Sequence, residues 1–422
     1  MRLIIDLTPF LHDKISHDNF VRPPQMQKQA VNDLGIFGGP KLFDHTISTS
    51  NLVKPNIDIF LKYSTIFYEK KQYTNNGPVV QLLEGRLAAF HHTKHCISFA
   101  NGFWAIVLAI KCLAIPGKTE IIMPSLTYRR LADIAAWTGL EPHFCEVDPQ
   151  TLAMNSRTVS ACINENTALI LAAHPIVNCC DVEGISALSR VAGVPLLFDA
   201  VESVYETVGG RKIGSFGNAE CFSLHASKLI NGFEGGYITT NDERLAGRLS
   251  IMRGFGFFGQ DNVLEFGINS KLNEVHASMA LACLDEIDDQ VERNRERYYS
   301  YKAALGPISG LRLLEFDESE KTSYKNIVVE LMDDWPLTRE ETLEILHAEG
   351  ALARAYYAPP LHQKVMLYPY IAAHLPITDQ LSQRFMLLPC GHFVSQFDIA
   401  SLGKLLSFLE KNPALIKERL ST

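Results

Sequence analysis

Between residues 120 and 200, short apolar runs alternate with stretches whose apolar residues recur at helical spacing. Run 168–173, Ala-Leu-Ile-Leu-Ala-Ala, contains no polar residue. Parallel strands read as continuous apolar runs because helices cover both faces of the sheet. The pattern therefore predicts an α/β fold, with a mostly parallel central sheet flanked by helices. Strands are expected at 120–124, 142–147, 168–173, 195–200 and 237–240. Helices are expected at 129–137 and 182–191, and a further helical pattern follows the last strand and ends at residue 253.

At 422 residues the chain is long enough to form more than one core. Residues 1–40 contain two adjacent prolines and a Gly-Gly-Pro turn, and are expected to form an N-terminal arm. Residues 41–300 are expected to form the large domain, which ends in a long charged helix from 272 to about 301. Residues 301–422 then predict a smaller α+β domain with a strand at 325–331 and helices at 339–349 and 399–411.

Composition excludes several classes of protein. A formal net charge of −8 argues against a nucleic-acid binder, which needs a basic face. No apolar run approaches the roughly 20 residues that span a bilayer, and the N-terminal stretch does not resemble a secretory signal, so a cytoplasmic protein is expected. Nine cysteines without a CxxC pair indicate neither a disulfide framework nor a zinc site. His91, His92 and His95 are more typical of a polar surface than of a metal site, so no metal is predicted.

Two short segments contain residues suited to catalysis. Phe-Asp-Ala-Val-Glu at 198–202 and Cys-Phe-Ser-Leu-His-Ala-Ser-Lys at 221–228 both begin as strand-like runs. Asp199 falls at the carboxyl end of a parallel strand, where α/β sheets bind ligands, although it could also cap the next helix. Lys228 alone could be a surface lysine. Together the segments offer an amine, a carboxylate and hydroxyl groups, which are the parts that pyridoxal 5′-phosphate (PLP) chemistry requires.

Several motifs occur in an order that resembles a known family. They are Pro-Ser-Leu-Thr-Tyr at 124–128, Asp-Ala-Val-Glu-Ser at 199–203, Ser-Leu-His-Ala-Ser-Lys at 223–228, Glu-Gly-Gly at 234–236 and Gly-Ile-Asn-Ser-Lys-Leu-Asn-Glu at 267–274. From about residue 74 to the C-terminus the chain resembles the DegT/StrS family of PLP-dependent sugar aminotransferases. The resemblance implies the aspartate aminotransferase fold, a PLP-dependent transferase of fold type I.

The resemblance also implies a role for each matching residue. Lys228 would form the Schiff base with PLP, and Asp199 would pair with the pyridine nitrogen and keep it protonated. Glu202 would lie near the ring oxygen, Tyr128 over the ring and Ser223 on the phosphate. The asparagine of the last motif, Asn269, would reach the phosphate of a neighbouring subunit, which implies a homodimer with shared active sites.

Two segments depart from the family pattern. At 101–104 the sequence is Asn-Gly-Phe-Trp where the family has a Gly-Thr turn that opens a phosphate-binding helix. Gly102 and Phe103 are therefore expected to offer backbone N–H groups to the phosphate, without the threonine hydroxyl. Arg129 and Arg130 stand where the family has small or apolar residues. They either begin a solvated helix or recognise an anionic group of the substrate or amino donor.

A lysine at the Schiff-base position favours transamination, because the related sugar dehydrases carry histidine there. Segments 74–78, 353–359 and 388–391 resemble the branch that acts at C4 of nucleotide-linked 4-keto-6-deoxyhexoses. Asn75 and His362 are further candidates for substrate contact. The expected function is transfer of an amino group from glutamate to such a keto sugar, with Lys228 moving the proton. The alternatives are a PLP-dependent dehydrase or lyase, an aminotransferase for a keto substrate without a nucleotide, and a PLP-binding regulator without turnover.

Overall fold

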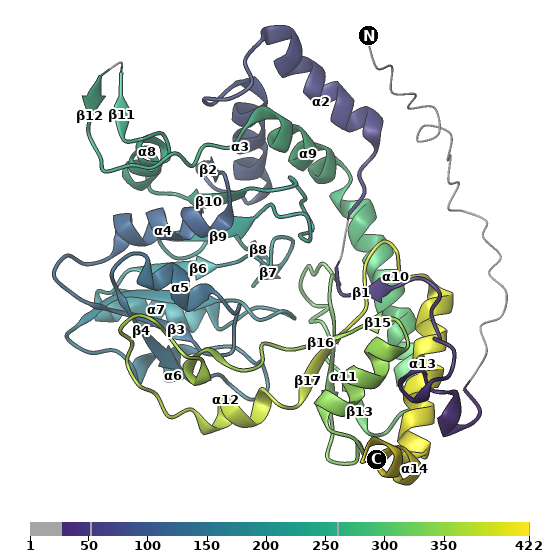
Figure 1. Ribbon diagram of the computed structural model, residues 1–422. Coiled ribbons are helices and arrows are strands. Elements are labelled where there is room, and N and C mark those ends of the chain that lie inside the picture. The colour runs from purple at the N-terminus through teal and green to yellow at the C-terminus, as the bar shows by residue number, and fades with distance from the viewer. Residues whose placement is uncertain (1–27, 51–52, 260, 422) are drawn as a thin grey trace, which may run out of the picture.

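The computed structural model describes residues 28–50, 53–259 and 261–421 (Figure 1). Its central element is a seven-stranded sheet in the order β2-β10-β9-β6-β5-β3-β4. The strands are β2 (His95–Phe99), β3 (Glu120–Pro124), β4 (Glu141–Cys145), β5 (Thr167–Ala173), β6 (Leu196–Asp199), β9 (Ala219–Ser223) and β10 (Gly236–Thr240).

Most neighbouring strands of this sheet run parallel. The parallel pairs are β3–β4, β3–β5, β5–β6 and β6–β9, whereas β10 is antiparallel to both of its neighbours, β9 and β2. The prediction of a mostly parallel α/β sheet is confirmed. The direction of β10 could not be predicted, because an apolar strand looks the same in either direction.

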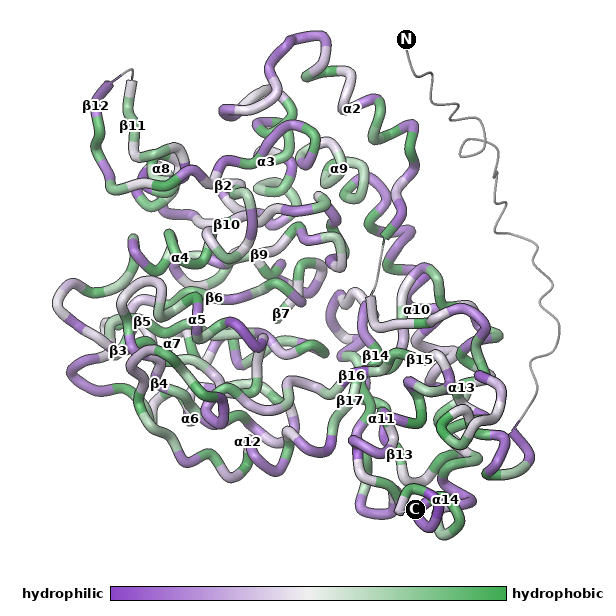
Figure 2. The backbone as a smooth tube through the Cα atoms, in the orientation of Figure 1, coloured by the Kyte–Doolittle hydropathy of each residue, from purple (hydrophilic) through white to green (hydrophobic). Residues whose placement is uncertain are grey.

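Successive residues of the central strands enter two different cores. Ile121 and Leu169 pack in one core together with α4 (Gly102–Leu113), whereas Ile122 and Ile170 pack in the other. This alternation follows from the two-residue period of a strand. Both faces are covered, so the strands need no polar positions, and Figure 2 shows α4 as a largely hydrophobic helix beside them.

Helices cover the sheet on both faces (Figure 1). Helix α5 (Leu131–Ala136) begins at Leu131 and not at Arg129 as expected, because Arg130 has a non-helical backbone with φ −119°. The other helices of this part are α2 (Ile57–Lys70), α3 (Pro78–Phe90), α6 (Ser156–Ser160), α7 (Val182–Ala192), α8 (Glu243–Met252) and α9 (Glu274–Asp285). Shorter elements are β7 (Thr207–Val208), β8 (Arg211–Lys212), the β11 (Phe257–Phe258) and β12 (Asn262–Val263) hairpin, and η4 (Leu361–Gln363).

The single long helix expected from 272 to 301 is instead two helices, α9 and α10 (Ile287–Leu305), which meet at Glu286. Asp285 accepts a hydrogen bond from Tyr63 at 2.8 Å and pairs with Arg86. The Glu286 carboxylate accepts the Asn56 backbone N–H at 2.8 Å. These contacts hold the chain against α2 and α3 at the break, which the sequence pattern of α9 and α10 did not reveal.

The C-terminal part forms a second, smaller sheet that is antiparallel throughout, in the order β13-β14-β17-β16. Helix α10 runs from the large sheet into this region, where it packs on α13 (Figure 1). The elements are β13 (Leu311–Leu313), β14 (Ile327–Leu331), α11 (Arg339–Ala348), β15 (Ala351–Leu352), β16 (Arg354–Ala355), α12 (Pro376–Leu381), β17 (Phe385–Leu388), α13 (Gln396–Lys411) and α14 (Pro413–Leu420).

Residues 28–48 pack on this C-terminal region. They include η2 (Val31–Asp33), η3 (Gly35–Phe37) and β1 (Ile47–Ser48), which pairs in parallel with β15. The buried Glu349 carboxylate pairs with Lys28 at 2.8 Å and accepts the Gly35 and Leu42 N–H groups at 2.7 Å. Residues 41–48, which the sequence assigned to the large domain, thus lie against the small one. The first 27 residues of the expected arm lie outside the described residues.

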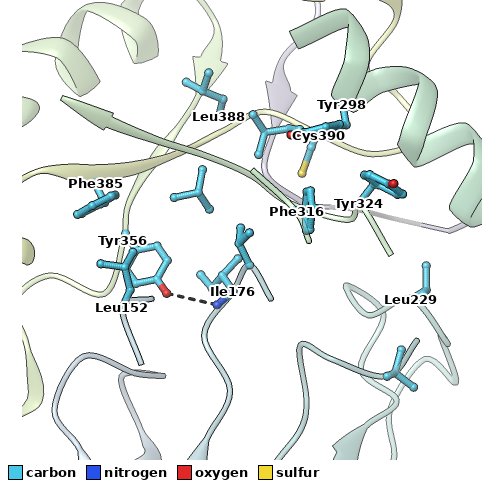
Figure 3. Packing of buried hydrophobic residues seen from close by; sticks show 14 of the residues in the cluster. Leu152, Ile176, Leu229, Tyr298, Phe316, Tyr324, Tyr356, Phe385, Leu388 and Cys390 are labelled. Carbon is cyan, nitrogen blue, oxygen red and sulfur yellow. Dashed lines mark hydrogen bonds between the residues drawn. The ribbon is translucent and has the colours of Figure 1, made fainter. Parts of the chain in front are cut away.

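Buried aromatic side chains fill the C-terminal core near its junction with the large sheet (Figure 3). Tyr298, Phe316 and Tyr324 form a cluster with ring centroids 5.1–5.4 Å apart. The Tyr356 hydroxyl accepts the backbone N–H of Ile176 at 3.3 Å, drawn as the dashed line in Figure 3. This bond joins the segment after β5 to the segment after β16, so it fixes the C-terminal sheet relative to the large sheet.

His91 differs from its expected place on a polar surface, because it is fully buried at the end of α3. Its Nδ1 lies 2.6 Å from the Ile213 carbonyl oxygen and its Nε2 lies 2.9 Å from the Tyr237 hydroxyl. Burial lowers its pKa to about 3, so the ring is neutral. Among the described residues, no group of three or more His, Cys, Asp or Glu could hold a metal ion. None of the helices described is long and apolar enough to cross a membrane.

Candidate active site

The carboxyl ends of several sheet strands open into one cavity of about 1510 Å³. Asp199 ends β6, Ser223 ends β9, and Lys228 and Tyr128 lie in the loops that follow β9 and β3. Nine of the twelve predicted site residues line this cavity, and they come from separate parts of the chain. They are Gly102, Phe103, Tyr128, Arg129, Arg130, Asp199, Glu202, Ser223 and Lys228.

The Lys228 amine forms an ion pair with Glu202, which makes a second ion pair with Lys325. Lys228 Nζ donates to Glu202 Oε1, and Lys325 Nζ donates to Oε2 at 2.7 Å. Burial alone would raise the pKa of Glu202, but the two ammonium groups outweigh burial and lower it. Glu202 is therefore an anion at neutral pH. The sequence indicated Glu202 but gave no sign of Lys325.

Asp199 is a buried carboxyl without an ion-pair partner among the described residues. It accepts the Val201 backbone N–H at 3.2 Å. Burial raises its pKa to about 6, although that N–H group and the charge of Lys228 act in the opposite direction. A cationic group brought into the cavity would supply the missing positive charge.

His174 also lines the cavity, and the sequence reasoning overlooked it. Its ring stacks on Phe198 at 5.5 Å with an interplanar angle of 7°. Nδ1 accepts the Cys180 N–H at 3.3 Å, so the proton of the neutral ring lies on Nε2, which is buried without a hydrogen-bond partner in the described part of the chain. Burial lowers the pKa of this histidine to about 3. Its position directly after the apolar β5 strand was the available signal.

The N-terminus of α4 forms another wall of the cavity. Gly102 and Phe103 begin the helix, and the Asn101 side chain accepts the Trp104 N–H at 2.9 Å. The first N–H groups of a helix have no partner within it and attract anions. Gly236 lets β10 approach this turn, since a Cβ at position 236 would lie 2.5 Å from the Gly102 nitrogen.

A cationic and aromatic group of residues forms a further part of the wall of the same cavity. Arg130 pairs with Asp133 at 2.8 Å, and Lys364 Nζ donates to the Arg129 carbonyl oxygen at 3.3 Å. Partial burial lowers the pKa of Lys364, and the neighbouring Arg129 charge lowers it further. Trp137, 65% exposed, lines the same cavity, and its ring centroid lies 6.4 Å from that of Phe103.

Three predicted site residues do not line the large cavity. Asn75 borders a separate hollow of about 210 Å³ with Arg253 and Lys271. Asn269 accepts a hydrogen bond from Lys271 Nζ at 2.6 Å beside this hollow. His362 is bonded to Ser125 Oγ at 2.7 Å and to Asp379 at 2.9 Å, with its side chain only 6% exposed.

Glu274 of the last motif has a structural role that the sequence did not reveal. Its carboxylate accepts the Val79 N–H at 2.7 Å and the Val80 N–H at 3.2 Å. It therefore caps α3 from the start of α9. A Cβ at Gly77 would lie 2.7 Å from this carboxyl group, so the glycine before α3 leaves the space it occupies.

The cavity residues supply the chemical groups that PLP binding requires. They offer an amine, an anion-attracting helix terminus, and, as far as the described residues go, a buried carboxyl that lacks a cation and a histidine N–H group that lacks a partner. With the α/β sheet, they define a PLP-dependent enzyme of fold type I. Residues 59–406 match the DegT/DnrJ/EryC1/StrS aminotransferase family, and the chain belongs to this family. It is a PLP-dependent aminotransferase, as the sequence predicted.

Known relatives cover most of the chain. A dTDP-4-amino-4,6-dideoxy-D-glucose transaminase of Escherichia coli is 25% identical over 86% of this chain and 98% of its own length. The enzyme of that name from Shigella dysenteriae is 27% identical, over 72% and 83% respectively. A GDP-perosamine synthase of Caulobacter vibrioides is 29% identical, over 72% and 81%. The structure of DesI with its TDP-sugar product covers 93% of this chain and 100% of DesI, at 29% identity and TM-score 0.88.

Proposed function

We propose that this enzyme transfers an amino group from glutamate to a keto sugar linked to a nucleotide, of the 4-keto-6-deoxyhexose class. The observation that carries the proposal is the extension of one cavity from Lys228 to the region of Arg129, Arg130 and Trp137. At about 1510 Å³ the cavity exceeds the usual size of a small-molecule site. The names of the transaminase and synthase relatives, which refer to sugars carrying dTDP or GDP, support it.

At the reacting end, PLP supplies a conjugated ring that takes up the electrons of a broken C–H bond. Lys228 would hold the cofactor and move a proton at the reacting carbon of the substrate. Asp199 would pair with the ring nitrogen and favour its protonated form by its negative charge. Glu202 would be placed near the ring oxygen, and Tyr128 would cover the ring face.

The phosphate of the cofactor is assigned to α4 and β9. The backbone N–H groups of Gly102 and Phe103 would bind its oxygens, since they are free of partners within the helix. The Ser223 hydroxyl, which accepts the His225 N–H at 3.2 Å, would donate its own proton to the same phosphate. These contacts would orient the cofactor without the threonine hydroxyl of other family members.

At the other end, Arg129 and Arg130 would bind the diphosphate of the nucleotide, because guanidinium groups match phosphate oxygens in charge and geometry. The exposed face of Trp137 is available to stack on the base. His362 is bonded to Ser125, three residues before Tyr128, so its role would be to hold this loop in place.

The enzyme would act as a homodimer. The β11–β12 hairpin projects from the large part of the protein (Figure 1). Apolar side chains of this hairpin and its flank are exposed, Phe258 by 60% and Phe266 by 91%. Such a patch is typical of a protein interface. Asn269 lies three residues further along the chain. A second copy that covered the hairpin would therefore place the cavity of that second copy near Asn269 of the first. Asn75 would then contact substrate from the partner's side.

The amino donor and the acceptor sugar can be tested separately, because each reacts in its own half-reaction. The holoenzyme is mixed with glutamate, and 2-oxoglutarate is measured together with the absorption band of the bound cofactor. Nucleotide-linked 4-keto-6-deoxyhexoses are then tested for reversal of the spectral change, with the sugar phosphate lacking the nucleotide as the matched control. Absence of 2-oxoglutarate would refute glutamate as donor. Equal rates with and without the nucleotide would refute the substrate class.

The double variant Arg129→Ala/Arg130→Ala should raise KM for the nucleotide-linked sugar about tenfold or more, because it removes two charge-assisted contacts. Its reaction with glutamate should remain unchanged. For the dimer, Lys228→Ala and Asn269→Ala proteins are mixed after dissociation. Hybrids would contain one intact site and recover up to about a quarter of the activity. Recovery of none would argue against a shared site.

A further inference from the structure

A second buried lysine reaches the active site from the C-terminal part of the chain. Lys325 precedes β14 by two residues, and its side chain is only 7% exposed. Its Nζ lies 2.7 Å from Oε2 of Glu202, while the other carboxylate oxygen accepts from Lys228. The Asn326 amide is 3.4 Å from the same Oε2. One carboxylate thus joins two ammonium groups from different parts of the chain.

We propose that Lys325 is a positioning residue of this active site, which holds Glu202 as a fixed anion and disfavours protonation of the Lys228 nitrogen. The inference rests on the proposed function, because it assumes that the cofactor is held by Lys228. Family membership alone does not imply it, since it depends on the residue at position 325 and on its contact with Glu202.

Binding of the cofactor to Lys228 changes the partners of Glu202. In the structure, the Glu202 carboxylate pairs with the ammonium groups of Lys228 and Lys325. Once the Lys228 nitrogen bonds to the cofactor, its charge depends on pH. A buried carboxylate that loses its cation tends to take up a proton. Lys325 remains in place and keeps Glu202 ionised.

Lys325 also acts on Lys228 through space. A positive charge disfavours protonation of a nearby nitrogen, and a negative charge favours it. Lys325 offsets part of the effect that the nearer Glu202 carboxylate has on the Lys228 nitrogen. Without Lys325, the proton shared by Glu202 and the Lys228 nitrogen would be retained to a higher pH. We therefore expect Lys325 to keep the Lys228 nitrogen able to release its proton near neutral pH.

The other titratable groups near Glu202 do not replace this cation. Burial raises the pKa of Tyr356 and Tyr357 and brings that of Cys390 to about 11, so these side chains are neutral near pH 7. Asp199 is an acid, with its pKa raised to about 6 mainly by burial. Among the described residues whose charges act on Glu202, the cations are Lys228 and Lys325.

The test is a pH titration of the absorption band of the bound cofactor in the full-length holoenzyme. In Lys325→Met the midpoint should rise by about one to three pH units, as expected for loss of a charge within about 4–6 Å. Lys325→Arg should restore the wild-type midpoint, because it restores the cation. The matched control is Lys212→Met, which removes another buried lysine that donates to the Tyr205 carbonyl oxygen outside the cavity.

A second variant separates charge from packing. Lys325→Gln keeps a hydrogen-bond donor towards Glu202 but lacks the charge, so its midpoint should rise like that of Lys325→Met. If both variants melt at lower temperature and titrate like the wild type, Lys325 is structural and the proposal is wrong. Borohydride reduction of the wild type, followed by mass spectrometry of the Lys228 peptide, tests the underlying assumption. Absence of cofactor on that peptide would refute the proposed function itself.

Discussion

Replacing Asp199 by asparagine should stabilise the cofactor-free protein while it removes the activity. The carboxyl is buried, and burial raises its pKa from the ordinary 3.8 to about 6. The folded state therefore binds this proton more tightly than the unfolded state. Stability from this group is present below about pH 4 and is lost as the pH rises through 6. The difference of about two pH units, at about 1.36 kcal/mol each, gives roughly 3 kcal/mol.

Asparagine removes this penalty, because it is neutral and its side-chain oxygen can still accept the Val201 N–H. Urea and thermal unfolding of the cofactor-free wild type and Asp199→Asn should be compared from pH 4 to pH 8. We expect the variant to be more stable by up to about 3 kcal/mol at pH 7.5, with little difference at pH 4. With PLP present the advantage should disappear, since a protonated ring nitrogen neutralises Asp199. A variant that is no more stable at pH 7.5, or a difference independent of pH, would refute this reasoning.

Three further substitutions test other contacts. Lys228→Ala should prevent covalent attachment of the cofactor, as seen by mass spectrometry after borohydride reduction, and lower the amination rate at least about a hundredfold. Glu274→Ala leaves the Val79 N–H without its acceptor and should lower the free energy of unfolding by about 1–3 kcal/mol, measured in urea. Tyr356→Phe removes the acceptor of the Ile176 N–H and should cost about 1 kcal/mol in the same assay. Unchanged midpoints for either of the last two would contradict the importance of these bonds.

The sequence predicted most strands of the large sheet because they are short and apolar on both faces, but β2 was not predicted. Strands β3, β5 and β6 lie within one residue of the expected limits. The break at Glu286 was missed, because the contacts that hold it come from Asn56, Tyr63 and Arg86, more than 190 residues earlier in the chain. Helical spacing carries no information about such distant contacts.

The candidate site was predictable where chemistry required a particular residue type in a motif. Asp199, Ser223 and Lys228 meet in one cavity because each follows a strand of the same sheet. Lys325 has no such signal, since its segment is adjacent to the site only through the packing of the C-terminal part. His174 directly follows a predicted strand, so its position at the edge of the sheet was visible in the sequence.

The close approach at Gly236 has a consequence for attempts to change the substrate of this enzyme. Position 236 is buried within β10 and does not line the cavity, so a library aimed at cavity residues would treat it as free to vary. Any side chain there would collide with the backbone of Gly102 and displace the start of α4. A selection for new substrates would then lose cofactor binding first, and such losses would be mistaken for a failure of the redesigned sugar site.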